Sequence, residues 1–135
     1  MQTYLFASGL VLFLLGLVTG LLVPVSKNPR MGVAGHLQGM TNGPLLIIAG
    51  LLWPYLELPD AWQLATFWLL IYGTYANWLG VQLAALWGAG AKLAPIAAGE
   101  HRSTPLKERV VTFLLFSLIP AMFAAPIILL IGILR

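Results

Sequence analysis

Four long stretches without a single Asp, Glu, Lys or Arg make up most of this chain, at residues 3–23, 33–56, 61–87 and 110–134. A helix needs about 20 apolar residues to cross the hydrocarbon core of a bilayer, and each stretch reaches that length. The chain is 60% hydrophobic and only 8% charged, which leaves too few polar side chains to cover the surface of a soluble domain. We therefore predict an all-α integral membrane protein, a four-helix bundle that forms a single domain over residues 1–135.

The charged residues lie almost entirely in the connections between these stretches. Six of the seven cations fall in the first and third connections, namely Lys27, Arg30, Lys92, Arg102, Lys107 and Arg109. The positive-inside rule then predicts that these two connections are cytoplasmic and that both termini face outward. The cations are too few and too dispersed to follow a phosphate backbone, so we expect no nucleic-acid partner.

The segments that flank the apolar stretches set the expected boundaries. The opening Met-Gln-Thr-Tyr lacks the basic residues of a signal peptide, so we expect the first stretch to remain as a helix. Residues 95–105 read Pro-Ile-Ala-Ala-Gly-Glu-His-Arg-Ser-Thr-Pro, which predicts a loop. The absence of cysteine excludes disulfides and thiolate metal sites.

Polar residues inside the apolar stretches concentrate in the second and third. They are His36, Gln38, Thr41 and Asn42 in the second stretch, and Tyr72, Thr74, Tyr75, Asn77 and Gln82 in the third. A polar group in hydrocarbon costs free energy unless it has a partner. We therefore predict that these two helices line a site.

Glycines share a face of the second stretch with its polar residues. At about 100° per residue, one arc of less than half the helix carries, in order, Gln38, Asn42, Gly35, Gly39, Gly43 and His36. Glycines spaced by four residues make a flat strip that a neighbouring helix or a planar molecule can approach closely. Both interpretations remain open for the glycines, and the two asparagines are equally compatible with hydrogen bonds between helices.

His36 has two interpretations as well, an interfacial hydrogen-bonding residue or a metal ligand. If it binds a metal, the chain has too few further ligands within reach for a site made of protein side chains alone. Haem supplies four equatorial nitrogens and requires one ligand from the protein. A single histidine would also leave the other face of the iron open for a substrate.

Two segments carry a resemblance to known enzymes: GHLQGMTNGPLLIIAGLLWP at 35–54 and YGTYANWLGVQLAALWGAG at 72–90. The chain resembles the bacterial hydroxylaminobenzene mutases and, more distantly, the styrene oxide isomerases, which are four-helix membrane enzymes. The styrene oxide isomerases also begin a helix with histidine, five residues and Asn-Gly, which here are His36, Asn42 and Gly43. The third helix lacks the aspartate of those enzymes, and its tyrosines lie upstream of the expected position.

The resemblance implies a function and a set of site residues. It implies an isomerase of the bacterial inner membrane that converts hydroxylaminobenzene to 2-aminophenol, with haem b held between the subunits of a homotrimer. His36 would ligate the iron, beside the glycine strip of Gly35, Gly39 and Gly43. The catalytic candidates are Asn42, Asn77, Tyr72 and Tyr75. The alternatives are a small four-helix transporter, disfavoured because no carboxylate lies in the stretches, and a haem-binding membrane protein without catalysis.

Overall fold

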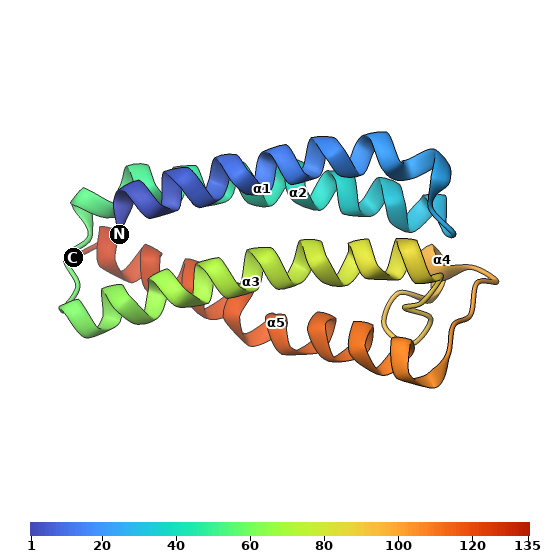
Figure 1. Ribbon diagram of the computed structural model, residues 1–135. Coiled ribbons are helices and arrows are strands. Elements are labelled where there is room, and N and C mark those ends of the chain that lie inside the picture. The colour runs from blue at the N-terminus through green and yellow to red at the C-terminus, as the bar shows by residue number, and fades with distance from the viewer.

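The computed structural model describes all 135 residues, and every regular element in it is a helix (Figure 1). The long helices are α1 (Gln2–Leu22), α2 (Pro29–Leu52), α3 (Asp60–Trp87) and α5 (Pro105–Ile133). Short 3₁₀ turns, η1 (Val23–Val25) and η2 (Trp53–Tyr55), continue α1 and α2. The all-α prediction is confirmed.

The number of helices differs from the expected four. A fifth, short helix, α4 (Pro95–Ala98), lies within the segment that we expected to be a loop throughout. Pro95 occupies the first turn, where its missing N–H costs nothing. Gly99 ends the helix with a φ of 56°, a conformation that glycine adopts without strain. Buried Asn28 holds this turn in place, because its Nδ2 donates to the carbonyl of Ala97 at 3.0 Å.

Two of the long helices, α2 and α5, begin well before their apolar stretches, at Pro29 and Pro105. The side chain of Asn28 caps α2 by accepting hydrogen bonds from the backbone N–H groups of Arg30 and Met31 at 3.1 and 3.3 Å. Pro29 and Pro105 occupy the first turns of α2 and α5. The charged residues just before each apolar stretch are helical as well. The cap and the first-turn prolines therefore set where these helices begin.

Helices α1 and α2 form a closely packed antiparallel pair along their whole length (Figure 1). Glycines meet glycines in this seam. A Cβ at Gly16 would lie 2.9 Å from the Cα of Gly39, and a Cβ at Gly9 would lie 2.7 Å from the carbonyl oxygen of Gly43. Such distances leave no space for a methyl group, so only glycine allows the two backbones to approach this closely.

Helices α3 and α5 form the second pair, and α3 also packs against α2. Glycines of α3 face side chains of α5 here. A Cβ at Gly73 would meet the sulfur of Met122 at 2.9 Å, and one at Gly80 would meet Leu115 at 3.0 Å. Side chains therefore keep the backbones of this pair apart.

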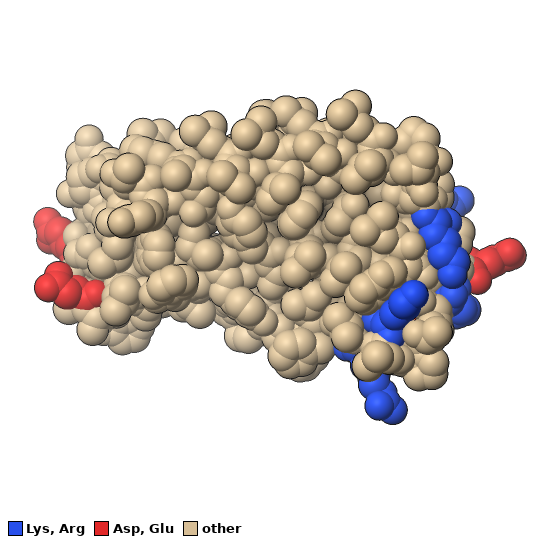
Figure 2. Space-filling view, viewed as in Figure 1, with Lys and Arg blue, Asp and Glu red and all other residues tan.

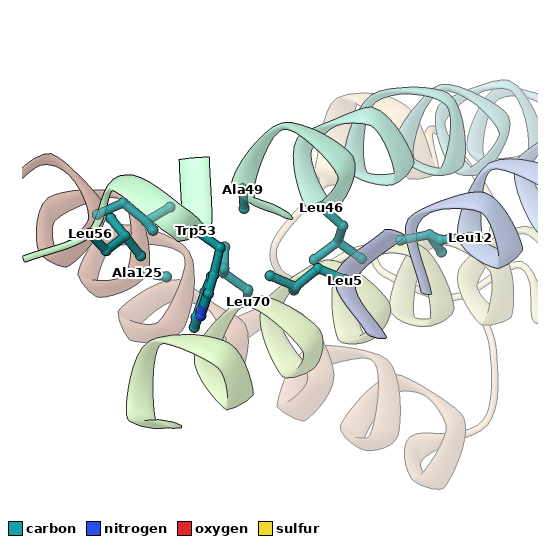
Figure 3. Packing of buried hydrophobic residues seen from close by; sticks show 9 residues of the cluster. Leu5, Leu12, Leu46, Ala49, Trp53, Leu56, Leu70 and Ala125 are labelled. Carbon is teal, nitrogen blue, oxygen red and sulfur yellow. The ribbon is translucent and has the colours of Figure 1, made fainter. Parts of the chain in front are cut away.

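Two groups of buried residues hold the bundle together. At the end that carries both termini, Leu5, Leu46, Trp53 and Leu70 pack with their neighbours (Figure 3). At the opposite end the cluster is built largely from alanines, with Met31 and Val111. The middle of the bundle is where the polar residues of α2 and α3 meet.

The surface separates apolar and charged regions. Two helical segments, Gln2–Val25 and Pro105–Ile133, have the length and apolar composition needed to cross a membrane. The visible Lys and Arg side chains gather at one end of the molecule, while the broad middle carries no charged side chain in this view (Figure 2). Large exposed side chains such as Leu14, Trp68 and Phe123 contribute to the apolar surface.

Candidate functional site

His36 lies on α2 at its seam with α1. Its Nδ1 is 2.8 Å from the carbonyl oxygen of Gly16. A carbonyl oxygen can only accept a hydrogen bond, so in the neutral ring Nδ1 carries the proton and Nε2 keeps its lone pair. Gly20 makes room for the ring, because a Cβ at this position would lie 2.8 Å from Nδ1. Two glycines of α1 thus fix the orientation and the tautomer of the imidazole.

The Nε2 atom of His36 is the nitrogen available to a ligand. The chain has two fully buried side-chain polar atoms without a hydrogen-bond partner, one in Gln82 and one in Glu108. Nε2 of His36 also has no partner in the chain but is not among these buried atoms. It is therefore accessible at the surface of the partly buried ring. Metal-binding histidines commonly donate their other N–H to a backbone carbonyl, which is the arrangement found here. No cluster of three His, Cys, Asp or Glu side chains accompanies His36. The ring fits a group such as haem, which requires a single axial ligand from the protein.

A cluster of side-chain amides joins α2 to α3. The Oε1 atom of Gln38 accepts hydrogen bonds from Nδ2 of Asn77 at 2.8 Å and from Nδ2 of Asn42 at 3.3 Å. Asn42 is only 4% exposed, and its Nδ2 also lies 3.4 Å from the carbonyl oxygen of Thr74. These bonds engage the amide nitrogens of both asparagines. Their Oδ1 atoms form no hydrogen bond within the chain and remain available as acceptors.

The two predicted tyrosines lie on the outer face of α3. Tyr75 donates to the carbonyl oxygen of Ser8 on α1 at 2.9 Å, and the hydroxyl of Tyr72 lies 2.5 Å from that of Ser117 on α5. Both rings line a groove of about 390 Å³, together with Trp68, Ile71, Ala76, Trp78, Leu79 and Leu114. All its lining residues are hydrophobic, so an aromatic ring could lie here.

The predicted site residues do not converge within one subunit. Asn77 is two residues beyond Tyr75, which rotates it by about 200° around α3. The amide cluster therefore faces α2, while the tyrosine groove faces away from it. His36 belongs to neither, because its ring bonds to Gly16 of α1 and does not line the groove. The structure thus places the predicted residues at three separate locations: the His36 edge, the amide cluster between α2 and α3, and the tyrosine groove.

The glycine strip of α2 is covered. Gly39 and Gly43 pack against the backbone of α1, and a Cβ at Gly35 would lie 3.0 Å from Oε1 of Gln82. No planar cofactor can lie against these glycines inside the subunit. The structure gives them a packing role, and the cofactor-binding role predicted for Gly35, Gly39 and Gly43 gains no support from it.

Other residues at the site escaped the sequence-based assignment. Gln38 is the acceptor that joins both asparagines, and its spacing of four residues from Asn42 was a signal for this. Gly16 and Gly20 orient His36, yet nothing in their sequence neighbourhood identifies a histidine partner. Trp78 also donates to the hydroxyl of Thr19 at 3.1 Å, which ties α3 to α1 beside the same seam.

Comparison with known proteins agrees with the resemblance described above. The family model described as "Styrene oxide isomerase" matches residues 1–134. The chain is 50% identical over 110 residues to "Hydroxylaminobenzene mutase HabB" of Ectopseudomonas oleovorans, a match that covers 82% of this chain and 67% of that protein. No solved structure matches the chain. The predicted resemblance is confirmed: the chain belongs to the styrene oxide isomerase family and is an isomerase.

Proposed function

We propose that this isomerase converts hydroxylaminobenzene to 2-aminophenol by moving the hydroxyl group from nitrogen to the ortho ring carbon. The identity to the mutase of Ectopseudomonas oleovorans supports this substrate. The N–O bond breaks and a C–O bond forms. The ortho hydrogen leaves as a proton and the nitrogen gains one. Substrate and product have the same atoms and electrons, so the reaction requires neither a reductant nor dioxygen.

The observation that carries the proposal is the orientation of His36. The 2.8 Å contact with the carbonyl of Gly16 leaves Nε2 of the neutral ring unprotonated, and Nε2 is not among the fully buried atoms without a partner. We propose that Nε2 holds haem b. When bound, ferric haem would supply a Lewis acid for the hydroxylamine oxygen. The contribution of the chain is to keep the imidazole in one tautomer and one orientation.

Asn42 is the proposed substrate-orienting residue. It lies six residues after His36, about 9 Å further along the helix axis at 1.5 Å per residue, so it is suited to contact substrate rather than iron. Its free Oδ1 can accept a hydrogen bond from the N–H of the hydroxylamine, while its Nδ2 is held by Gln38. Asn77 is held by the same acceptor and offers a second free Oδ1.

Tyr72 and Tyr75 are proposed to orient the ring and to exclude water. The groove that they line is entirely apolar. Water would compete with the transferred hydroxyl for the electron-poor ring, so an apolar wall favours its return to the neighbouring ortho carbon. The hydroxyl groups of both tyrosines already have partners on α1 and α5, which fixes the rings.

We propose a homotrimer with haem at the subunit interfaces. The proposal rests on the separation of the His36 edge, the amide cluster and the tyrosine groove on different faces of one subunit. Surfaces of neighbouring subunits could complete a site that a single chain leaves divided.

We also propose that the whole bundle lies in the bacterial inner membrane. Two helical segments have the composition of membrane spans, and the side-chain amides of Asn42 and Asn77 are bonded between α2 and α3, with Asn42 only 4% exposed. The cation-rich end would face the cytoplasm and both termini would face outward.

Incubation of membranes that contain the protein with hydroxylaminobenzene tests the proposal. We expect 2-aminophenol to form without air or NADH, and to retain the substrate oxygen when the reaction runs in ¹⁸O-water. Strong incorporation of ¹⁸O, or a strict need for a reductant, would exclude the intramolecular transfer. A transporter or a haem-binding protein without catalysis would form no product.

A further inference from the structure

A cavity of about 480 Å³ lies at the cation-rich end of the molecule, apart from the three locations described above. It is formed by the connection that follows α3 and by the beginning of α5. Lys92 and Arg109 line it together with Glu108, and Leu93, Phe113 and Phe116 supply its apolar wall. The same cavity therefore presents cations and a hydrocarbon surface.

One wall of this cavity is held rigidly. The Oε2 atom of Glu108 accepts a hydrogen bond from the backbone N–H of Gly90 at 2.9 Å. Gly90 has a φ of 100°, which suits glycine and strains other residues. This contact fixes the connection that carries Lys92 against α5. The cavity is thus built into the fold.

The charges of the cavity suit an anion. Lys92 and Arg109 are exposed, and neither forms an ion pair within the chain. With the carboxylate of Glu108, the formal charge of the lining is +1. A single phosphodiester would balance it.

The apolar wall extends along α5 toward the middle of the bundle. Phe113 and Phe116 are three residues apart on one face of the helix, and they are 67% and 66% exposed. Helix α5 is also one of the segments with the composition of a membrane span. A ligand that fits both walls has an anionic head and a long apolar chain.

We propose that this cavity binds an anionic phospholipid. Its phosphate lies between Lys92 and Arg109, and one acyl chain lies along Phe113 and Phe116. Basic pockets at the cytoplasmic membrane surface are suited to anionic head groups. The proposal rests on the membrane placement proposed above, and it assigns a function to cations that the isomerase reaction does not use.

Native mass spectrometry of the full-length protein in detergent tests this site with three probes. They are phosphatidylglycerol, phosphatidylcholine with the same acyl chains, and soluble glycerol phosphate. We expect the wild type to retain phosphatidylglycerol at least about fivefold better than phosphatidylcholine. Arg109→Gln should lose this preference. Arg102→Gln, which removes a cation from the same end outside the cavity, should keep it.

Phe113→Ala gives a second test that leaves the charge unchanged. It should weaken retention of phosphatidylglycerol and keep a normal thermal unfolding midpoint. Equal retention by Arg109→Gln and Arg102→Gln would overturn the site. Displacement of the lipid by glycerol phosphate at equal concentration would assign the cavity to free phosphate and overturn the lipid proposal.

The result can be separated from the test of the isomerase. A protein that forms 2-aminophenol but shows no lipid preference overturns the lipid site alone. A protein that prefers phosphatidylglycerol but forms no 2-aminophenol overturns the proposed reaction alone.

Discussion

The α1–α2 pair and the α3–α5 pair both contain glycines in their seams but use them differently. In α1–α2 the glycines bring backbone against backbone, and a Cβ at Gly39 would lie 2.7 Å from the nitrogen of Gly16. In α3–α5 the glycines accommodate flexible side chains, such as Met122 opposite Gly73. Backbone atoms cannot move aside singly, whereas a methionine can change its rotamer. The first seam is therefore rigid and the second can adapt.

The largest expected effect is that of Gly39→Ala. The new methyl group would overlap the Cα of Gly16, so the two helices must separate. We expect the variant to lose most of the folded protein recovered in detergent, measured by size-exclusion chromatography and thermal unfolding. Recovery of a wild-type unfolding midpoint would show that the first seam is as adaptable as the second.

His36→Ala tests whether the rigid seam orients a ligand for the proposed haem. We expect purified wild-type protein to show a Soret band and the variant to lose most of it while still folding, because the ring is only partly buried and makes a single hydrogen bond, to Gly16. His101→Ala is the control, since this second histidine lies in the polar connection. A colourless wild-type protein with full activity would refute the proposed role of haem.

Asn42 lies where α2 of the first pair meets α3 of the second pair. Asn42→Ala tests whether this contact serves the reaction or only the packing. If its Oδ1 accepts a hydrogen bond from the substrate N–H where charge develops, the rate should fall by roughly 10²-fold, the size of effect seen when an enzyme loses one hydrogen bond to its transition state. Thr41→Ala is the neighbouring control, because its exposed hydroxyl bonds only to its own helix. Normal turnover with reduced thermal stability would assign Asn42 to helix packing.

The smallest expected effect is that of Gly73→Ala, the counterpart of the first variant in the adaptable seam. Alanine favours the helix by about 1 kcal/mol over glycine, and the displacement of Met122 offsets part of this gain. We expect the stability to change by no more than about 1 kcal/mol in either direction. A loss as large as that of Gly39→Ala would remove the distinction between the two seams.

Much of the fold could be predicted because apolar length alone defines four long helices. Their starts could not, because capping by Asn28 and the first-turn prolines extends α2 and α5 beyond the apolar residues. Helix α4 was missed because a single turn has too few residues to show a periodic pattern. The cap and the first-turn prolines therefore set the helix starts that the apolar pattern did not predict.

The candidate site was predicted less completely. The residues from Gln38 to His36 share one face of α2, as predicted. Helical periodicity does not show which neighbouring helix contacts that face, and in the structure α1 packs against Gly39 and Gly43. That Asn77 and Tyr75 face different sides of α3 could have been predicted from their two-residue spacing. The partner of His36 could not have been predicted, because Gly16 lies 20 residues away on another helix.

The glycine seam of α1 and α2 also has a consequence for assembly. Glycine has no side-chain rotamers to lose, so the glycine positions of this seam lose no side-chain entropy when it closes. Within a bilayer, where water no longer drives apolar surfaces together, close backbone contact is a main source of attraction between helices. We therefore expect α1 and α2 to close as a hairpin during synthesis, before α3 and α5 have left the ribosome, and to serve as the template on which they assemble.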